Sequence, residues 1–205
     1  NFPTIGAVLQ HLYRGQKYLP PSVRLPHNIF NTDLSVWPGQ DSGWLGHAAD
    51  PWLFNCEPAS PNFDVPQFRL QADVALGRLS QRQTLLEQLE QRLRDVDRGP
   101  KENTYNLQRD QALALLGTPK ARQACDLNLE PPTVRDRYGR DQFGQSVLLA
   151  RRLVDAGVGF VQVNWFRGPE EPSNAPCWDS HAKEGDRLKN VLMPSFDTAY
   201  SALLS

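Results

Sequence analysis

Residues 142–165 contain the change of pattern that most constrains this fold. Apolar side chains recur at helical spacing through its first part, at Phe143, Val147, Ala150 and Val154. Gly157 then supplies a stop, and residues 158–164 form a β-branched and aromatic run of strand length. Near-continuous apolarity is typical of parallel strands covered on both faces. The pattern therefore predicts a helix over 142–156 that leads into a buried strand with parallel neighbours, which is half of an α/β unit.

The segment after this strand is the first candidate for a functional loop. Residues 166–177 are rich in Gly, Pro, Ser and Asn, and the segment closes on Trp178-Asp179-Ser180-His181. Ligands of open parallel sheets bind beyond the carboxyl ends of the strands. Because carboxylate and imidazole groups bind divalent metals, Asp179 and His181 are candidate metal ligands. The alternative is that Asp179 caps the following turn and that His181 lies at the surface.

Charge and composition argue against several classes of partner. The 205 residues carry 22 Lys and Arg against 23 Asp and Glu, for a formal net charge of −1, and no basic run stands out. Nucleic acid and anionic membranes are therefore poor candidates for partners. No apolar run reaches the roughly 18 residues of a transmembrane segment, and no signal peptide opens the chain. Because the chain begins at Asn1 without Met and stops within a predicted helix, we expect it to be part of a longer protein.

The N-terminal third combines a helix, a short strand and a long loop. Thr4 is suited to cap a helix that ends near Gly15, and prolines bracket a short strand at 23–25. Residues 30–66 are dense in Gly, Pro, Asn and Asp, which predicts a loop. We expect this loop to be ordered because it carries aromatic anchors, namely Trp37, Trp44, Trp52, Phe54 and Phe63.

The centre of this loop is a second candidate site. Residues 37–47 contain three glycines, which allow the backbone to approach a ligand closely. Long loops held on a rigid scaffold are commonly functional. Gln40, Asp41 and His47 are therefore candidates for substrate contact, and a structural role for His47 is the competing interpretation.

The middle of the chain predicts helices. Leucines spaced seven apart make residues 70–96 the longest periodic segment, which breaks at Gly99-Pro100 before shorter helices. We expect a helical insertion over about 70–126, packed as a hairpin, with a coiled-coil partner as the alternative. A polar loop over 130–140 should follow, and the chain should end in an amphipathic helix that is kinked or split before Pro194.

The cysteines give no metal or redox motif. Cys56, Cys125 and Cys177 lie far apart and include no Cys-x-x-Cys pair. The stretch from Cys56 to Ser60 resembles the Cys-x-Pro-x-Arg motif that sulfatases convert to an aldehyde nucleophile, but Ser60 stands where the motif needs arginine. We therefore do not expect Cys56 to act as a nucleophile.

Two stretches of the chain carry a family resemblance. The first runs from Tyr138-Gly139-Arg140 through Arg151-Arg152-Leu153 and the predicted strand to Trp178-Asp179-Ser180-His181. The second is Pro38-Gly39-Gln40-Asp41-Ser42-Gly43-Trp44-Leu45-Gly46, followed by Asp50-Pro51. Together they resemble a bacterial family of sulfatase-like proteins labelled domain of unknown function 1501. The resemblance spans most of the chain.

The resemblance implies an α/β fold and a hydrolytic activity. The family is similar to the alkaline phosphatase superfamily, whose members hydrolyse phosphate or sulfate esters at metal ions beyond a mostly parallel sheet. By this resemblance residues 1–205 are the middle portion of one alkaline phosphatase-like domain, in which Asp179 and His181 bind a divalent metal such as zinc, calcium or manganese. Their Asp-x-His spacing is shorter than the Asp-x-x-x-His of phosphatase-like relatives.

The rest of the implied active site is expected outside this chain. The superfamily needs an early Asp with a nucleophile and a later Asp-His pair, so residues 1–205 would hold an incomplete metal site. The implied substrate is a small-molecule or polysaccharide ester, and the implied location is extracytoplasmic, in the periplasm. The competing class is a non-catalytic member of the fold that binds glycan or protein through its aromatic loop.

Overall fold

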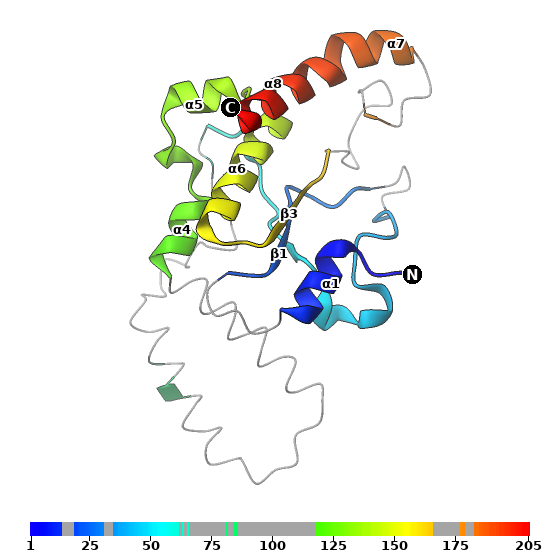
Figure 1. Cartoon of the computed structure of the whole chain (residues 1–205), viewed down its shortest axis with the longest axis vertical. Helices are drawn as coiled ribbons and strands as arrows, with labels where there is room; N and C mark the ends of the chain where they lie inside the picture. The colour runs from blue at the N-terminus through cyan, green and yellow to red at the C-terminus, as the bar shows by residue number, and fades with distance from the viewer. Residues whose placement is uncertain are drawn as a thin grey trace.

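The computed structural model describes residues 1–13, 19–30, 35–61, 63, 65, 81, 84–85, 118–165, 177–178 and 183–205 (Figure 1). The elements in chain order are α1 (Ile5–Leu12), β1 (Ser22–Leu25), η1 (Gly43–Leu45), η2 (His47–Ala49), β2 (Trp52–Leu53), α4 (Pro119–Cys125), η4 (Leu127–Leu129), α5 (Pro132–Arg137), α6 (Gln142–Ala156), β3 (Phe160–Val163), α7 (Glu184–Arg187), η5 (Leu188–Leu192) and α8 (Met193–Leu204). The fold is α/β, with a three-stranded parallel sheet and flanking helices.

β1 is the central strand of this sheet. The strand order is β2-β1-β3, both pairs are parallel, and all four β1 residues are buried. Alternation along β1 sends Val23 and Leu25 into the hydrophobic core. Ser22 and Arg24 face the opposite side, where the Ser22 hydroxyl donates a hydrogen bond of 2.8 Å to the Gly6 carbonyl of α1.

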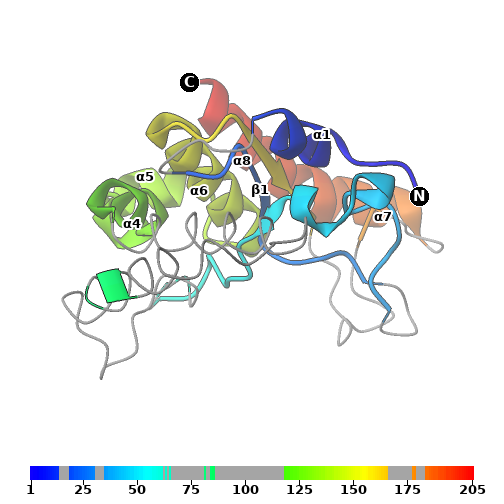
Figure 2. The same cartoon turned by 90° about the horizontal axis from the view of Figure 1, so that it is seen from below.

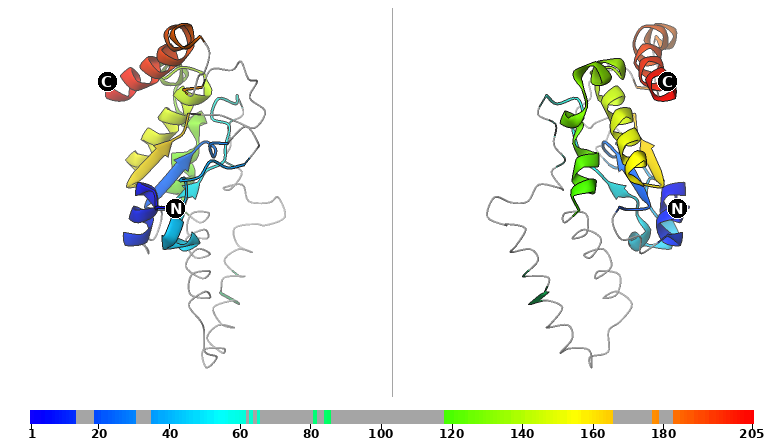
Figure 3. Two further views of the ribbon diagram at one scale, coloured as in Figure 1. Left: turned by 90° about the vertical axis from the view of Figure 1, so that its right-hand side faces the viewer. Right: turned by 60° about the vertical axis from the view of Figure 1, so that its left-hand side comes forward.

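Helix α6 covers the core face of the sheet. Asp141 caps its start by accepting a hydrogen bond of 2.9 Å from the Gly144 amide, and Gly157 ends it in a left-handed conformation with φ 113°. Its three leucines, Leu148, Leu149 and Leu153, have no exposed surface. In the right-hand view of Figure 3, α4 and α6 lie on one side of the strands and α1 on the other. Both faces of the central strand are therefore covered, as a parallel sheet requires.

The C-terminal helices run together as one rod, and α8 packs on α6 (Figures 1 and 2). Pro194 lies in the first turn of α8, directly after the π-helical stretch η5. Because proline lacks the N–H that would continue a regular helix, the predicted kink or split before Pro194 takes the form of this π-helical stretch, through which the chain stays helical. None of the helices within the described ranges combines the length and apolarity needed to cross a membrane.

The predicted helix-to-strand unit is largely confirmed. The helix over 142–156 has the predicted bounds as α6, and Thr4 caps α1 by accepting a hydrogen bond of 3.1 Å from the Ala7 amide. The strand has the parallel neighbour that was predicted, but it is shorter, Phe160–Val163. Its residues are half-buried rather than covered on both faces, because β3 forms an edge of the described sheet.

A strand and an α-helix lie where the sequence predicts only loop. β2 pairs with β1 inside the loop over 30–66, and two residues are too few for any pattern to reveal. Helix α5 replaces the polar loop predicted over 130–140, because Pro132 starts a helix in its first turn. Its Arg135 is buried and donates to the Gln145 side chain at 2.7 Å. This arginine therefore attaches α5 to α6, and burial lowers its pKa from the ordinary value.

The aromatic anchors of the long loop divide into two groups. Phe54 and Phe63 are buried, with 1% and 4% of their surface exposed, and belong to the core as predicted. Trp44 is 71% exposed and Trp37 38% exposed, so the prediction that they pin the loop is wrong for Trp44. Most of the helical insertion predicted over 70–126 lies outside the described residues.

Leu153 and Val154 provide a matched test of the core. Leu153→Ala should lower the free energy of unfolding by about 2–5 kcal/mol, because it leaves a cavity beneath α6. Val154 is 53% exposed, so Val154→Ala should change stability by less than about 1 kcal/mol. Urea unfolding monitored by circular dichroism measures both, and equal effects would contradict the packing of α6 on the sheet.

Candidate functional site

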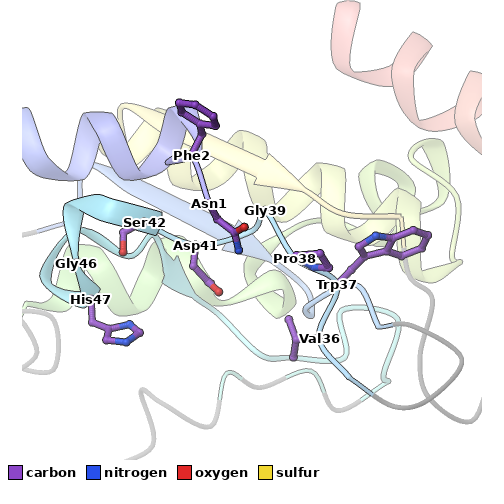
Figure 4. Close-up of a pocket in the computed structure, with 11 residues that line it drawn as sticks. Asn1, Phe2, Val36, Trp37, Pro38, Gly39, Asp41, Ser42, Gly46 and His47 are labelled. Carbon is purple, nitrogen blue, oxygen red and sulfur yellow. The ribbon is translucent and has the colours of Figure 1, made fainter.

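Asp41 and His47, two of the predicted contact residues, line one cavity, called here the loop cavity. Its volume is about 360 Å³. Figure 4 shows its lining, which consists of Asn1, Phe2, Val36, Trp37, Pro38, Gly39, Asp41, Ser42, Gly43, Gly46 and His47. Aromatic and apolar side chains alternate here with a carboxylate, a hydroxyl and an imidazole. This mixture is typical of a site that binds a polar organic molecule.

Gln40 does not line the loop cavity but holds the backbone around it. Its residue surface is 5% exposed, and its side-chain amide makes three hydrogen bonds of 2.8 Å. The oxygen accepts from the Ile29 amide, and the nitrogen donates to the carbonyls of Ile29 and Trp37. Both donor hydrogens of the amide are therefore engaged in this conformation. This geometry gives Gln40 a positioning role, and its contact with substrate stays a prediction.

Arg24 lies behind the same loop, on the central strand. One terminal nitrogen of its guanidinium donates to the Gln40 carbonyl, and the other lies 3.4 Å from a carboxylate oxygen of Asp41. Arg24 is 4% exposed, whereas the side chain of Asp41 is 57% exposed. Asp41 therefore contacts both a buried cation and the loop cavity.

His47 and Asp50 form an ion pair at the rim of the cavity. Nδ1 of His47 lies 2.9 Å from one carboxylate oxygen of Asp50, and the other oxygen accepts a 2.8 Å hydrogen bond from the Ser42 amide. The hydrogen bond and charge of Asp50 raise the pKa of His47 above its ordinary value. Partial burial pushes the pKa of Asp50 upward, but hydrogen bonds from Ser42 and His47 outweigh it and hold that pKa below its ordinary value. The pair is therefore favoured in its charged form.

Gly43 is required where the loop meets the N-terminal segment. Its φ is 53°, a left-handed conformation that side chains rarely adopt. A Cβ at this position would also clash with the Asn1 carbonyl. The glycine therefore permits the close backbone approach that the sequence predicts for this loop.

A second polar cluster lies beyond the carboxyl ends of the three strands. It consists of His27 after β1, Asn55 and Glu57 after β2, and Asn164 after β3. The His27 imidazole contacts the Asn55 side chain and lies 2.9 Å from a carboxylate oxygen of Glu57. Asn164 donates a 2.7 Å hydrogen bond to the His27 carbonyl. Sequence reasoning missed this cluster because the strand pairing that assembles it is not visible in the chain. The available signal was that each residue comes soon after a strand.

Aromatic rings anchor the described part of the segment after β3. A continuous series of ring contacts, with centroids 4.6–6.0 Å apart, joins Phe143, Trp165, Trp178, Phe196 and Tyr200. Trp178 contacts both Trp165, directly after the strand, and Phe196 of α8. The residue before Asp179 in the sequence is therefore held between β3 and α8.

The predicted metal ligands, Asp179 and His181, lie outside the described residues, so their role remains a prediction. Within the ranges that the structure describes, no group of three or more His, Cys, Asp or Glu side chains is arranged to hold a metal ion.

Neither buried cysteine is suited to nucleophilic chemistry. Burial raises the pKa of the Cys56 thiol to about 12, and burial likewise raises that of Cys125 to about 12. Because the thiolate is the reactive form, both thiols are inert at neutral pH.

Comparison with known families gives a match that covers the whole chain. The model of the family described as "Protein of unknown function (DUF1501)" matches residues 1–205. The chain belongs to the DUF1501 family. No curated protein and no solved structure matches it. Membership of DUF1501 confirms the family resemblance stated from the sequence.

The His47–Asp50 ion pair of this DUF1501 chain leads to a prediction about pH. His47 should titrate above about pH 6.5 in an NMR titration of the folded chain, and Asp50→Asn should bring its pKa down. Because the folded-state pKa of His47 is raised, the pair's contribution to stability is present below about pH 6.5, as long as Asp50 is ionised, and is lost as pH rises through the folded-state pKa of His47.

Asp136→Asn is the control for this titration, because the Asp136 carboxylate pairs with Arg140 rather than with His47. It should leave the His47 titration unchanged. A His47 that titrates at its ordinary value in the unsubstituted chain would show that the pair does not form in solution.

Proposed function

We propose that this chain is part of a metal-dependent hydrolase of phosphate or sulfate esters, of the alkaline phosphatase and sulfatase type. In this proposal Asp179 and His181 are metal ligands, while Asp41 and His47, on a loop positioned by Gln40, contact the substrate. A divalent cation such as zinc, calcium or manganese would polarise the ester and stabilise the charge that develops on it. The nucleophile and the remaining ligands come from outside residues 1–205, in an extracytoplasmic protein.

The observation that carries the proposal is the parallel sheet together with the polar residues that come after its strands. Ligands of parallel α/β sheets gather beyond the carboxyl ends of the strands. β3 leads to Asn164 and the anchored Trp178, after which Asp179 is next in the sequence. His27 and Glu57 contribute polar groups beyond the other two strands. A polar edge of this kind supports a site for a charged, metal-assisted reaction.

The loop cavity supports a substrate of modest size. Its volume of about 360 Å³ suits a small organic ester or one unit of a polysaccharide. Asp41 and His47 line it, so it offers polar groups of both charges to such a molecule.

Exposed aromatic rings favour one alternative, a non-catalytic DUF1501 module that binds glycan or protein. Phe2 is 86% exposed and Trp37 38% exposed in the lining of the loop cavity, and Trp44 in the same loop is 71% exposed. Exposed aromatic faces supply contact area for sugar rings and for protein partners. In this alternative Asp179 and His181 are loop and cap residues.

Substitution of the two ligands separates these functions. In the longer parent protein, Asp179→Ala and His181→Ala should each lower metal occupancy and ester turnover together, by roughly 10²-fold or more, because a lost ligand removes both the metal and its charge. Elemental analysis of the purified variants and phosphatase and sulfatase assays measure the two effects.

Asp136→Ala, at a surface pair on α5, is the control and should leave metal content and turnover unchanged. Stoichiometric metal that survives both ligand substitutions would show that the site lies elsewhere. A parent protein with neither metal nor turnover, but with affinity for glycan or protein, would favour the non-catalytic alternative.

A further inference from the structure

The buried guanidinium of Arg24 is incompletely paired. Its Nη1 donates to the Gln40 carbonyl, its Nη2 lies 3.4 Å from Asp41, and its Nε has no hydrogen-bond partner among the described residues. The side chain is 5% exposed, so it is largely removed from water. A buried charge is costly unless good hydrogen bonds compensate for its loss of water. Arg24 therefore carries a buried donor, Nε, that no described residue satisfies.

The two poorly paired donors, Nε and Nη2, lie on one edge of the guanidinium. The N–H groups of Nε and Nη2 point in the same direction. Together they form the edge that binds two oxygens of a carboxylate, phosphate or sulfate at once. Asp41 satisfies this edge poorly, because its 3.4 Å contact is longer than the roughly 2.7–2.9 Å of a good charge-assisted hydrogen bond and reaches only one nitrogen. Asp41 thus contacts this edge at Nη2 alone and leaves Nε without a partner among the described residues.

Asp41 also connects this edge to the loop cavity. Its side chain is 57% exposed and lines the cavity, so it can turn into solvent by giving up its contact with Arg24. His47 also lines the cavity, where its imidazole carries a positive charge when it is protonated, with Asp50 as its partner. Arg24 itself does not line the cavity, so an anion that enters would reach its guanidinium only after Asp41 turns away. The carboxylates of Asp41 and Asp50 would oppose the entry of that anion.

We propose that the loop cavity binds a tetrahedral oxyanion, phosphate or sulfate, which takes the place of Asp41 on the Nε and Nη2 edge of Arg24. The inference rests on the proposed function and deepens it, since this anion is the phosphate or sulfate group of the ester. Arg24 is then a substrate-positioning residue, and Asp41 is its counter-ion when no substrate is present. Trp37 and Phe2 also line this cavity and would offer apolar surface to the organic part of the ester.

Binding of inorganic phosphate and sulfate to the chain of residues 1–205 tests this inference without metal or turnover. Asp41→Asn should tighten the binding of both anions about tenfold, because it removes a negative charge that competes for the guanidinium. In ¹⁵N NMR spectra, the Nε–H signal of Arg24 should shift on addition of either anion and not on addition of chloride. Comparison of the two affinities indicates which ester class the cavity prefers.

Two further variants make the test specific. Arg24→Lys, made together with Asp41→Asn, should weaken binding about tenfold relative to Asp41→Asn alone, because an ammonium group cannot donate from two fixed nitrogens. If this double variant does not fold, the shift of the Arg24 Nε–H signal in Asp41→Asn decides the matter. Asp136→Asn changes the same kind of carboxylate at a distant surface pair and should leave anion affinity unchanged.

The inference is overturned if Asp41→Asn leaves phosphate and sulfate affinity unchanged, or if the Arg24 Nε–H signal does not respond to either anion. The result is separate from that of the hydrolase proposal. Anion binding with no turnover in the parent protein would leave the cavity assignment standing and remove the enzymatic function. Turnover without anion binding at Arg24 would do the reverse.

Discussion

The fold depends on buried arginines that donate to backbone carbonyls. Arg24, on the central strand, donates to the carbonyl of Gln40, and Arg135, on α5, lies 3.4 Å from the carbonyl of Pro58. Each joins a regular element to an irregular loop that has no ladder of its own. An arginine side chain removed from water must find hydrogen-bond acceptors. The loop backbone is therefore held in place where its carbonyls accept from these two arginines. The candidate site is built on a loop whose position is set by this requirement.

Local pattern was sufficient to predict the parts of the fold in which pattern and packing agree. α6 has a cap at Asp141, an apolar stripe, and a left-handed stop at Gly157, so each signal gives the same bounds. β2 and α5 could not be predicted in this way. β2 is a strand only because β1 lies beside it. Helix α5 is attached to α6 by Arg135, a charged residue that would be expected at the surface but that donates a buried hydrogen bond to Gln145. The exposure of β3 likewise results from its place in the sheet rather than from its composition.

The sequence predicted where the candidate site lies better than it predicted the role of each residue in it. Glycines and aromatic rings marked the loop around Asp41, and the structure brings Asp41 and His47 to one cavity. The sequence could not show that Gln40 is saturated by backbone groups, since its partners Ile29 and Trp37 reach it only through the folding of the loop. Arg24 was missed for a related reason. A charged residue in a short apolar strand gives no sign of which loop will cover it.

The edge position of β3 determines how this sheet can grow. β1 is paired on both sides, so within the described sheet only β2 and β3 can accept another strand. Phe160 and Asn164 turn their N–H groups toward the β1 side, donating to Pro21 and Leu25. Because these directions alternate along a parallel strand, Val161 and Val163 turn their N–H groups outward.

Val161 and Val163 are the residues that this alternation presents to an incoming strand, and they also line an apolar groove of about 390 Å³ beside α6 and α8. A strand added here must align with these two valines, so its register is limited to steps of two residues. Its inward side chains must also be apolar to enter the groove. A short edge therefore specifies both the alignment and the composition of any strand that extends the sheet.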